Sequence, residues 1–372
     1  MWLEDTNKMT LDQDKLNWIQ DRKKPFLIAG PCSAESEEQL RKSITPILDK
    51  VSYVRAGIWK PRTRPGHFEG VGEKGLVWVK NLKANHSFKF ATEVGTPEHV
   101  ELALKYGVDL IWIGARTTVN PFLVSELAEA LKGTSLPVLV KNPIHPELAL
   151  WKGAIERFAT NNVHSLGAIH RGFHSYQKTA FRNIPLWQIP LDLKSEFPEL
   201  PLLCDPSHIG GDRSMIAGIS QKALDLAYDG LMIETHVNPD EALSDAKQQV
   251  TPENLRFILD HLTYRHRGFS EKTFVDQLEI IRDQIDEADL ELLQAVAKRM
   301  DLVGHIGEIK KENNVAIFQI SRWKEIFKSR LDMAKEHQLD ESFVIEMLRL
   351  LHQQSVKKQT EIFESETTKT NG

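Results

Sequence analysis

The stretch DLIWIGARTTVNPFLVSELAEALKGTSLPVLVKN, residues 109–142, contains a short apolar run, a helical segment and a second apolar run. The two apolar runs, at 109–116 and 137–142, have the length and near-continuous hydrophobicity of strands that are buried on both faces. The segment between them opens at Pro121, and proline suits the first turn of a helix. The stretch therefore predicts a strand, a crossover helix and a parallel strand.

The same alternation continues along most of the chain. Apolar runs occur at 25–32, 52–60, 88–94, 109–116, 137–142, 165–172, 201–208 and 230–237. Helical segments are expected at Glu35–Lys50, Glu73–Asn85, Pro97–Lys105, Pro121–Lys132, Pro146–Asn161, Arg213–Tyr228 and Thr251–His266. Eight strands that alternate with helices predict an α/β fold, a TIM (β/α)8 barrel. A doubly wound open sheet is the alternative, but such a sheet would not usually need eight strands.

Proline is absent from the 120 residues after Pro252, although the chain contains 17 prolines in its 372 residues. A long proline-free segment with few glycines predicts an all-α second domain. The expected organisation is an N-terminal extension at 1–24, the barrel at 25–263, a linker at 264–274, the helical domain at 275–364 and a disordered tail at 365–372.

The composition excludes several classes of protein. Hydrophobic residues make up 41% and charged residues 27% of the chain, as in an average globular protein. No window approaches the roughly 18 apolar residues of a membrane span, and the charged N-terminus lacks the apolar core of a signal peptide. A net charge of -5 argues against a nucleic-acid partner. Two cysteines, Cys32 and Cys204, cannot form a disulfide framework, which points to the cytoplasm.

Reactive side chains gather at the ends of the predicted strands, where a barrel carries its active site. The terminal residues of the eight runs are Cys32, Lys60, Glu93, Arg116, Lys141, Arg171, His208 and Glu234. Cations form the larger group: Arg55, Lys60, Arg62, Arg116, Lys141 and Arg171. Burying so many cations without anions would be prohibitive, so they predict a ligand that carries phosphate and carboxylate groups.

A second group combines one thiol, one imidazole and two carboxylates: Cys32, His208, Glu234 and Asp245. Carboxylates with imidazole suit manganese, iron or zinc, and the thiolate argues against a dedicated magnesium or calcium site. Cys204 lies within a predicted strand and is expected in the core.

The order of these motifs resembles one enzyme family over residues 25–250. The motifs are Ala29-Gly30-Pro31-Cys32-Ser33, Arg55-Ala56-Gly57, Lys60-Pro61-Arg62-Thr63, Thr92-Glu93-Val94, Ile113-Gly114-Ala115-Arg116, Leu139-Val140-Lys141, His170-Arg171-Gly172, Asp205-Pro206-Ser207-His208, Glu234-Thr235-His236 and Ala242-Leu243-Ser244-Asp245. They resemble the 3-deoxy-D-arabino-heptulosonate 7-phosphate (DAHP) synthases, which open the shikimate pathway. The chain departs from that pattern at Arg64, where the family usually has serine.

The resemblance implies a condensation of phosphoenolpyruvate with erythrose 4-phosphate that releases phosphate. It implies that Lys60, Arg116, Lys141 and Arg171 hold phosphoenolpyruvate, with Arg55 nearby, and that Arg62 and Thr63 take the aldose phosphate. Glu93 would position or activate the attacking water. Cys32, His208, Glu234 and Asp245 would hold a divalent metal, with manganese expected and iron, cobalt or zinc as alternatives. Octulosonate phosphate synthases share the fold and chemistry, but Pro61-Arg62-Thr63 favours the four-carbon aldose.

The helical domain carries three cations along an apolar stripe: Arg282, Arg299 and Lys310. Arg299 and Lys310 are 11 residues apart and fall within about 20° on a helix, so a small dianion could lie between them. Arg282 falls about 100° away and is expected to serve another copy's site. On a later helix, Ser355 and Gln359 are neighbours. By periodicity alone, a plain amphipathic bundle with surface cations remains the alternative.

Residues 275–362 resemble the all-helical chorismate mutases, which form intertwined dimers. The matching residues are Arg282, Arg299, Lys310, Arg322, Ser355 and Gln359. The resemblance implies that Arg299, the Ser355 region and a partner's Arg282 hold carboxylates, and that Lys310 and Gln359 donate to the ether oxygen of chorismate as it rearranges to prephenate. Gln319 and Trp323 stand where the family usually has acidic residues, so Glu325 would have to contact the substrate hydroxyl.

Three hypotheses follow from the two domains. The first is a bifunctional synthase and mutase that forms a homodimer or higher oligomer. The second is a synthase whose helical domain only senses a ligand, and the third is a metal-dependent aldolase with a passive dimerisation module. We also expect chorismate or prephenate, bound to the helical domain, to lower synthase activity.

Overall fold

The computed structural model describes residues 18–19, 24–60, 66, 68–163, 165–176, 178–265 and 272–365. The expected 1–24 extension, 264–274 linker and 365–372 tail fall mostly outside these residues, as do Arg62 and Thr63. The chain divides into two compact units, Met1–Arg267 and Gly268–Gly372, which are described separately below. None of the described helices is long and apolar enough to cross a membrane.

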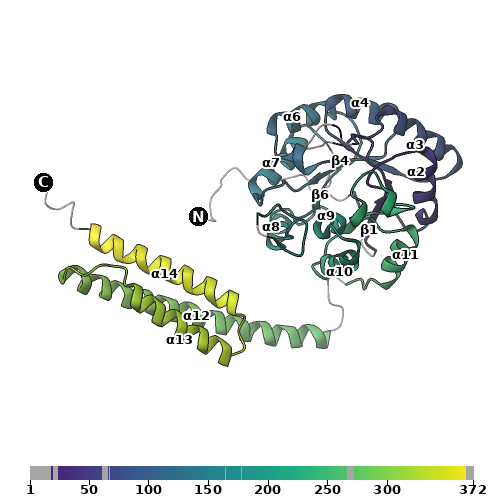
Figure 1. The fold of residues 1–372 in the computed structure, drawn as a ribbon. Coiled ribbons are helices and arrows are strands. Elements are labelled where there is room, and N and C mark those ends of the chain that lie inside the picture. Colours follow the sequence, from purple (N-terminus) through teal and green to yellow (C-terminus); the bar gives the residue numbers. More distant parts are fainter. Residues whose placement is uncertain are drawn as a thin grey trace. The chain divides into compact units, whose positions relative to one another are not determined.

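The first unit is a closed barrel of eight parallel strands, which confirms the predicted fold class (Figure 1). The strands are β1 Phe26–Gly30, β2 Tyr53–Arg55, β3 Phe90–Val94, β4 Leu110–Ile113, β5 Val138–Lys141, β6 Leu166–His170, β7 Leu202–Cys204 and β8 Gly230–Glu234. Neighbouring strands pair in chain order, and β1 closes the barrel on β8 with Gly30 opposite Glu234. The alternative of an open sheet is therefore excluded.

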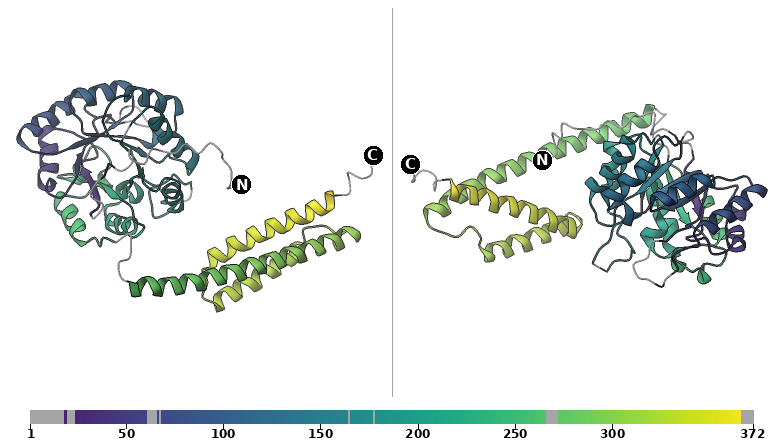
Figure 2. Two further views of the ribbon diagram at one scale, coloured as in Figure 1. Left: turned by 180° about the vertical axis from the view of Figure 1, so that it is seen from behind. Right: turned by 90° about the horizontal axis from the view of Figure 1, so that it is seen from above.

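Helices surround the strands in the alternating order that the sequence predicts (Figure 2). They are α2 Glu37–Ile44, α3 Glu73–Asn85, α4 Pro97–Lys105, α5 Ala115–Thr118, α6 Pro121–Ala130, α7 Leu148–Thr160, α8 Gln188–Glu196, α9 Pro206–Gly210, α10 Ile216–Asp225 and α11 Pro252–His261. Several begin as expected: α4, α6 and α11 have proline in the first turn, with side-chain caps from Thr96, Asn120 and Thr251.

The inside of the barrel is a packed core that is closed at one end by the N-terminal segment. Ile19 is buried with Ile28, Trp112 and Met232, and Trp18 packs against the same cluster. The indole of Trp18 donates to the carbonyl of Leu166 at 2.8 Å. The active site of the barrel is therefore expected at the opposite end, where the carboxyl ends of the strands meet.

The second unit contains three long helices, as the proline-free sequence predicts (Figure 2). They are α12 Lys272–Glu312, α13 Ile320–Glu336 and α14 Glu341–Glu364. Its buried cluster is small and includes Ala334, Val344 and Leu348. By contrast, Ile281, Ile285 and many other large apolar side chains of these helices are exposed. One copy of the helical unit therefore leaves much of its apolar stripe uncovered.

Candidate active sites

Three residues at the barrel mouth form a compact group of potential metal ligands. The donor atoms of Cys32, Glu234 and Asp245 lie within 4.8 Å of one another. Cys32 follows β1 and Glu234 ends β8, so the pairing of these two strands brings them together. Asp245 comes from the loop after β8 and adopts a left-handed conformation (φ 48°), which aspartate tolerates better than most residues. The group combines one thiol with two carboxylates.

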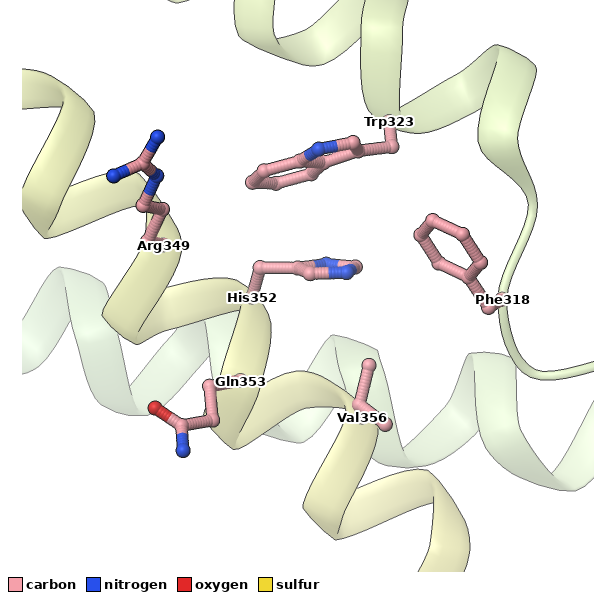
Figure 3. Close-up of a pocket in the computed structure, with 6 residues that line it drawn as sticks. All are labelled: Phe318, Trp323, Arg349, His352, Gln353 and Val356. Carbon is pink, nitrogen blue, oxygen red and sulfur yellow. The ribbon is translucent and has the colours of Figure 1, made fainter.

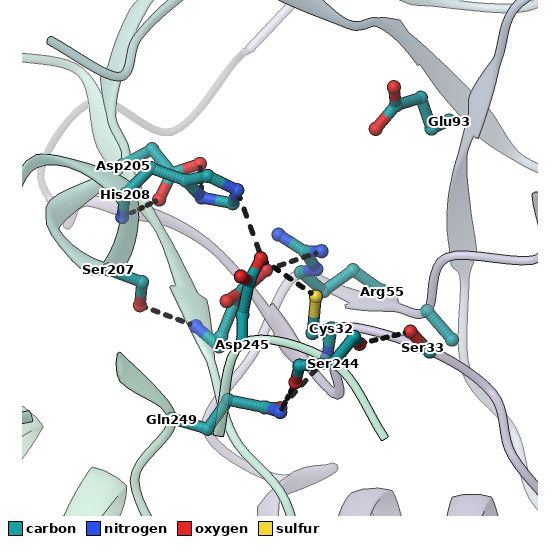
Figure 4. Close-up of polar contacts among 12 residues, drawn as sticks. Cys32, Ser33, Arg55, Glu93, Asp205, Ser207, His208, Ser244, Asp245 and Gln249 are labelled. Carbon is teal, nitrogen blue, oxygen red and sulfur yellow. Dashed lines mark hydrogen bonds and ion pairs between the residues drawn. The ribbon is translucent and has the colours of Figure 1, made fainter. Parts of the chain in front are cut away.

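Hydrogen bonds tie the loops that carry this group to each other (Figure 4). The buried amide of Gln249 accepts from the Cys32 backbone N–H at 2.9 Å and donates to the Ser244 carbonyl at 2.9 Å. The Ser33 and Ser244 hydroxyls also form a hydrogen bond. These contacts connect the loop after β1 with the loop after β8, which fixes Cys32 relative to Asp245.

His208 is the fourth expected ligand, and it lies beside the group. Its Nε2 is 3.9 Å from Glu234 Oε1, and its Nδ1 is 2.8 Å from Asp205 Oδ2. Burial lowers the pKa of His208 below its usual value, against the opposing charge of Asp205. Nδ1 faces Asp205 at ion-pair distance without hydrogen-bond geometry, and Nε2 is the ring nitrogen that faces Glu234. Asp205 thus occupies the place from which carboxylates orient metal-binding histidines.

The electrostatics of the group suit a bound cation. Burial, together with the charges of Glu234 and Asp245, raises the pKa of the Cys32 thiol to about 12 against the opposing charge of Lys60. Burial would also raise the pKa of Glu234, but the neighbouring His208 and Arg55 keep it below its usual value. Two ionised carboxylates beside a thiol repel one another, and a divalent cation would relieve this repulsion and favour the thiolate. The residues therefore fit a transition metal.

Arg55 is a buried cation with unused donors. Its Nη2 is 3.0 Å from Glu234 Oε1, and its guanidinium lies 4.9 Å from the ring centre of Trp112. Its Nε and Nη1 are buried and have no hydrogen-bond partner. Buried donors are seldom left unpaired, so these two atoms mark the place of an anionic ligand.

Lys60 and Lys141 flank the same region. Lys60 Nζ donates to Cys32 Sγ at 3.1 Å, and Lys141 Nζ donates to Asp205 Oδ2 at 2.7 Å. The stem of Lys60 fits only because residue 57 is glycine, since a Cβ on Gly57 would lie 2.5 Å from Lys60 Cε. Lys60 therefore contacts the candidate ligand Cys32, and Lys141 contacts Asp205, which lies beside His208.

Glu93 stands apart from the candidate metal ligands (Figure 4). Its carboxylate accepts a hydrogen bond from the indole of Trp112 at 3.1 Å. A Cβ on Gly114 would lie 2.1 Å from Glu93 Oε1, so glycine is required at position 114 for this placement. Glu93 is therefore a carboxylate at the mouth that contacts neither the metal-binding group nor its supporting residue Asp205.

The strand ends differ in detail from the sequence-based expectation. The strands β2 and β4 end at Arg55 and Ile113, earlier than predicted. Lys60 consequently lies in the loop after β2, and Arg116 lies in the short helix α5. The prediction that a reactive residue ends every strand is confirmed for Lys141 and Glu234. It was wrong for these two and also for Cys32, Arg171 and His208, which lie beyond the ends of β1, β6 and β7.

Sequence reasoning missed the residues that support the expected ligands. Arg182 Nη1 lies 3.0 Å from Asp245 Oδ1, and Asn183 Oδ1 accepts from Arg171 Nη1 at 2.8 Å. Gln248 Nε2 donates to Glu234 Oε2 at 2.6 Å. No local pattern identifies these residues, because their contacts form only when the mouth loops fold against one another, as for Arg182 and Asp245, which are 63 positions apart.

In the helical unit, Arg299 and Ser355 form a direct contact. Arg299 Nη1 donates to Ser355 Oγ at 2.8 Å, and burial lowers the pKa of Arg299. One turn later on α14, Gln359 is buried, and its Oε1 has no hydrogen-bond partner. Lys310 Nζ donates to the Ile317 carbonyl at 2.5 Å. These residues lie along the packed surfaces of α12 and α14.

Two other expected residues lie elsewhere in the helical unit. Arg282 is exposed on α12, about 25 Å along the helix axis from Arg299, so a single copy does not bring them together. Arg322 is exposed on α13, and it forms an ion pair with Glu325 at 2.8 Å.

A cavity of about 470 Å³ lies between α13 and α14 (Figure 3). Its lining residues are Phe318, Trp323, Arg349, His352, Gln353 and Val356. The rings of Trp323 and His352 stack 4.0 Å apart. Burial and the charge of Arg299 both lower the pKa of His352. The cavity is therefore an aromatic-walled space beside the Arg299 region, with Trp323 in the place where an acidic residue is usual.

Comparisons with known proteins agree with both units. A model of the DAHP synthetase I family matches residues 9–268, and a model of chorismate mutase type II matches residues 281–360. A phospho-2-dehydro-3-deoxyheptonate aldolase of Thermotoga maritima is 30% identical over 237 residues, which cover 63% of this chain and 68% of that protein. A 2-dehydro-3-deoxyphosphooctonate aldolase of Wolinella succinogenes is 28% identical over 263 residues, which cover 64% of this chain and 97% of that protein.

Solved structures give the same result for the barrel. The crystal structure of the phospho-2-dehydro-3-deoxyheptonate aldolase (DAHP synthase) from Thermotoga maritima aligns with a TM-score of 0.57 and 30% identity, over 63% of this chain and 67% of that one. A truncated form of the 3-deoxy-D-arabino-heptulosonate 7-phosphate synthase from Thermotoga maritima aligns with a TM-score of 0.55 and 28% identity, over 63% of this chain and 84% of that one.

A parallel barrel with a cationic mouth beside a thiol–carboxylate group defines a class of enzymes that act on phosphorylated acids. The family match specifies this class further, and the chain belongs to the DAHP synthetase I family. Its C-terminal unit is a chorismate mutase type II domain. The protein is therefore a bifunctional shikimate-pathway enzyme, with DAHP synthase activity in the barrel.

Proposed function

We propose specific roles for the barrel residues in the condensation of phosphoenolpyruvate with erythrose 4-phosphate. The observation that carries the proposal is Arg55, whose two unpartnered buried donors adjoin the Cys32, Glu234 and Asp245 group. An anion bound there would lie beside a divalent metal. Arg55, Lys60, Arg116, Lys141 and Arg171 would hold the phosphate and carboxylate of phosphoenolpyruvate.

Carbon 3 of phosphoenolpyruvate would attack the aldehyde carbon of the aldose phosphate, and water would attack carbon 2. Glu93 would take one proton from this water, which balances the proton that the former aldehyde oxygen takes up as it becomes a hydroxyl. Phosphate would then leave from carbon 2 with the second proton of the water, so that carbon 2 becomes a ketone. The isolation of Glu93 from the metal ligands and its hydrogen bond from Trp112 support this role. The cations neutralise the charge of the substrates as they approach each other.

Cys32, His208, Glu234 and Asp245 would hold the metal, and we propose manganese, with iron, cobalt or zinc as alternatives. The metal supplies Lewis-acid polarisation of the aldehyde oxygen when it is bound. Cys32 must stay a free thiol for this purpose, and both cysteines are free, which supports a cytoplasmic location.

The choice of aldose rests on Lys60, Pro61, Arg62 and Thr63. The relatives of this barrel include enzymes named for the heptonate and for the octonate products. We propose erythrose 4-phosphate as the substrate because the Pro61-Arg62-Thr63 sequence favours the shorter aldose, with Arg62 and Thr63 on its phosphate.

The metal proposal is tested by chelation of the full-length protein. Chelator should abolish phosphate release from phosphoenolpyruvate and erythrose 4-phosphate, and Mn²⁺ should restore it. Cys32→Ala should lose this activity and keep chorismate consumption, which controls for unfolding. Full synthase activity in excess chelator would refute the metal assignment.

For the helical unit, we propose that Arg299, Ser355 and a partner's Arg282 bind the carboxylates of chorismate. Lys310 and Gln359 would donate to its ether oxygen, and Arg322 would lie at the edge of the site. The contact of Arg299 with Ser355 and the burial of Gln359 one turn after Ser355 on α14 support this arrangement. Catalysis would be electrostatic stabilisation of the negative charge that develops on the ether oxygen, without a nucleophile or a metal.

We further propose that two copies associate through the helical unit to form a homodimer or a higher oligomer. The exposed apolar stripe of α12 and the distance between Arg282 and Arg299 support this proposal. Chorismate or prephenate bound to this unit would lower the activity of the barrel. The alternative function, a ligand-sensing unit with little mutase activity, is favoured by the replacement of an acidic residue by Trp323.

A further inference from the structure

Arg182 and Asn183 are adjacent in the segment between β6 and α8, and their side chains reach both parts of the barrel site. We propose that they act as a pair of positioning residues: Arg182 holds the metal-binding carboxylates, and Asn183 holds the phosphate-binding Arg171. The inference rests on the proposed metal and substrate sites and deepens them.

Arg182 contacts one carboxylate directly and another through a glutamine. Its Nη1 lies 3.0 Å from Asp245 Oδ1, and the same nitrogen donates to Gln248 Oε1. Gln248 in turn donates to Glu234 Oε2 at 2.6 Å. One guanidinium therefore restrains two of the four candidate ligands. Asp245 needs such a restraint because it lies in a loop, with a left-handed backbone.

The backbone around Arg182 is built to accommodate its side chain. Gly211 follows α9, the short helix that carries His208, and has φ +70°. A Cβ on Gly211 would lie 2.4 Å from the Cβ and 3.0 Å from the Cδ of Arg182. The Arg182 N–H also donates to the Gly210 carbonyl at 3.2 Å. The side chain of Arg182 thus packs against the C-terminal end of α9, the helix that carries the candidate ligand His208.

Asn183 uses both ends of its amide. Its Oδ1 accepts from Arg171 Nη1 at 2.8 Å, and its Nδ2 donates to the His208 carbonyl at 2.6 Å. An aspartate at this position would lose the donor, and an alanine would lose both bonds. Asn183 therefore fixes the Arg171 guanidinium relative to the backbone of His208.

A purely structural role explains Arg182 poorly. Its side chain is 45% exposed, and ion pairs at such positions contribute little to the free energy of unfolding. Residues that orient metal ligands, however, typically change metal affinity by about 10- to 100-fold when they are replaced. The expected consequence of losing Arg182 is therefore weaker metal binding with a nearly unchanged thermal midpoint.

The test is calorimetric titration of full-length, chelator-treated protein with Mn²⁺, combined with steady-state kinetics at saturating Mn²⁺. Arg182→Met should raise the Kd for Mn²⁺ about 10- to 100-fold, while the KM for phosphoenolpyruvate changes little. Arg182→Lys should recover part of the affinity, because lysine keeps the charge. Asn183→Ala should mainly raise the KM for phosphoenolpyruvate.

Arg256→Met is the matched control, because Arg256 pairs with Asp49 on the surface, away from the barrel mouth. It should leave both constants unchanged. A Kd for Arg182→Met within twofold of wild type would overturn the proposal for Arg182, and an unchanged KM for Asn183→Ala would overturn it for Asn183. If the wild-type protein bound no Mn²⁺, the metal assignment itself would fail, which is a separate result.

Discussion

Among single residues, a few buried ionisable side chains at the barrel mouth form the candidate metal and anion sites, and burial shifts their pKa values. Cys32, Glu234 and Asp245 lie close together, and Arg55 and Lys60 supply the neighbouring positive charge. Cys32, Glu234 and Asp245, which the structure brings together, were named from the sequence because they lie at or after the ends of recognisable strands. Arg182 and Asn183 could not be predicted in this way, because their contacts depend on how the mouth loops fold onto one another.

His170 illustrates a buried residue with a structural role. Its Nδ1 lies 3.0 Å from the Tyr228 hydroxyl, and its Nε2 lies 2.6 Å from the Pro185 carbonyl. Trp187 packs against the ring edge-on. Burial lowers the pKa of His170 from 6.5 to about 3, so the folded protein keeps it neutral. This neutral ring supports the end of β6, directly before Arg171.

The burial of His170 predicts a pH dependence of stability. Below about pH 6.5 the unfolded chain takes up a proton on His170, whereas the folded protein keeps this imidazole neutral down to about pH 3. The contribution of His170 to the free energy of unfolding is therefore largest above pH 6.5 and decreases as the pH falls. Its slope is about 1.4 kcal/mol per pH unit within this window. Urea unfolding of the barrel should show a smaller pH slope for His170→Gln than for wild type. Equal slopes between pH 6 and 4 would contradict the prediction.

At the scale of elements, the strand–helix alternation could be predicted, but the ends of the elements could not. Pro121 at the start of α6 marks its helix clearly, whereas α8 was missed. This helix carries Pro190 in its first turn and has few buried residues. The expected strand at 109–116 ends at Ile113, because the chain turns there into α5. Such turns are decided by tertiary contacts that hydrophobic periodicity does not record.

The length of α12 leads to a prediction about the helical unit. Arg282 and Arg299 cannot meet within one copy of this helix, so Arg282 should act in a partner's site. Arg282→Ala and Lys310→Ala proteins should each lack mutase activity. After mixing and subunit exchange, mixed dimers should regain one intact site, which gives roughly a quarter of wild-type activity at equal proportions. Chorismate consumption measures the recovery.

The control for this experiment is a mixture of two separately prepared samples of Lys310→Ala, which should stay inactive. Subunit exchange is verified with differently tagged chains. No recovery after verified exchange would mean that each site is built within one chain.

At the scale of the whole molecule, one chain joins the entry step of the shikimate pathway to a domain that acts later, at a branch point. Such a fusion offers a route for feedback, because the later domain binds the later metabolites. A ligand can exert feedback only if it binds one arrangement of the protein more tightly than another.

The expected result is that prephenate lowers the synthase activity of the intact protein. Lys310→Ala, which weakens the helical site, should reduce this inhibition and leave basal synthase activity intact. The measurement is phosphate release at increasing prephenate concentrations. Insensitivity over a range that saturates the mutase site would show that the fusion serves assembly or joint expression only.

The presence of two separate active sites in one chain is tested by assaying the purified protein with both substrate pairs. Wild type should release phosphate from phosphoenolpyruvate and erythrose 4-phosphate, and it should also convert chorismate to prephenate. Cys32→Ala should lose only the first activity, and Lys310→Ala only the second. If wild type failed to process one of the two substrate pairs, or if one of these variants lost both activities, the assignment of two separate active sites would be wrong.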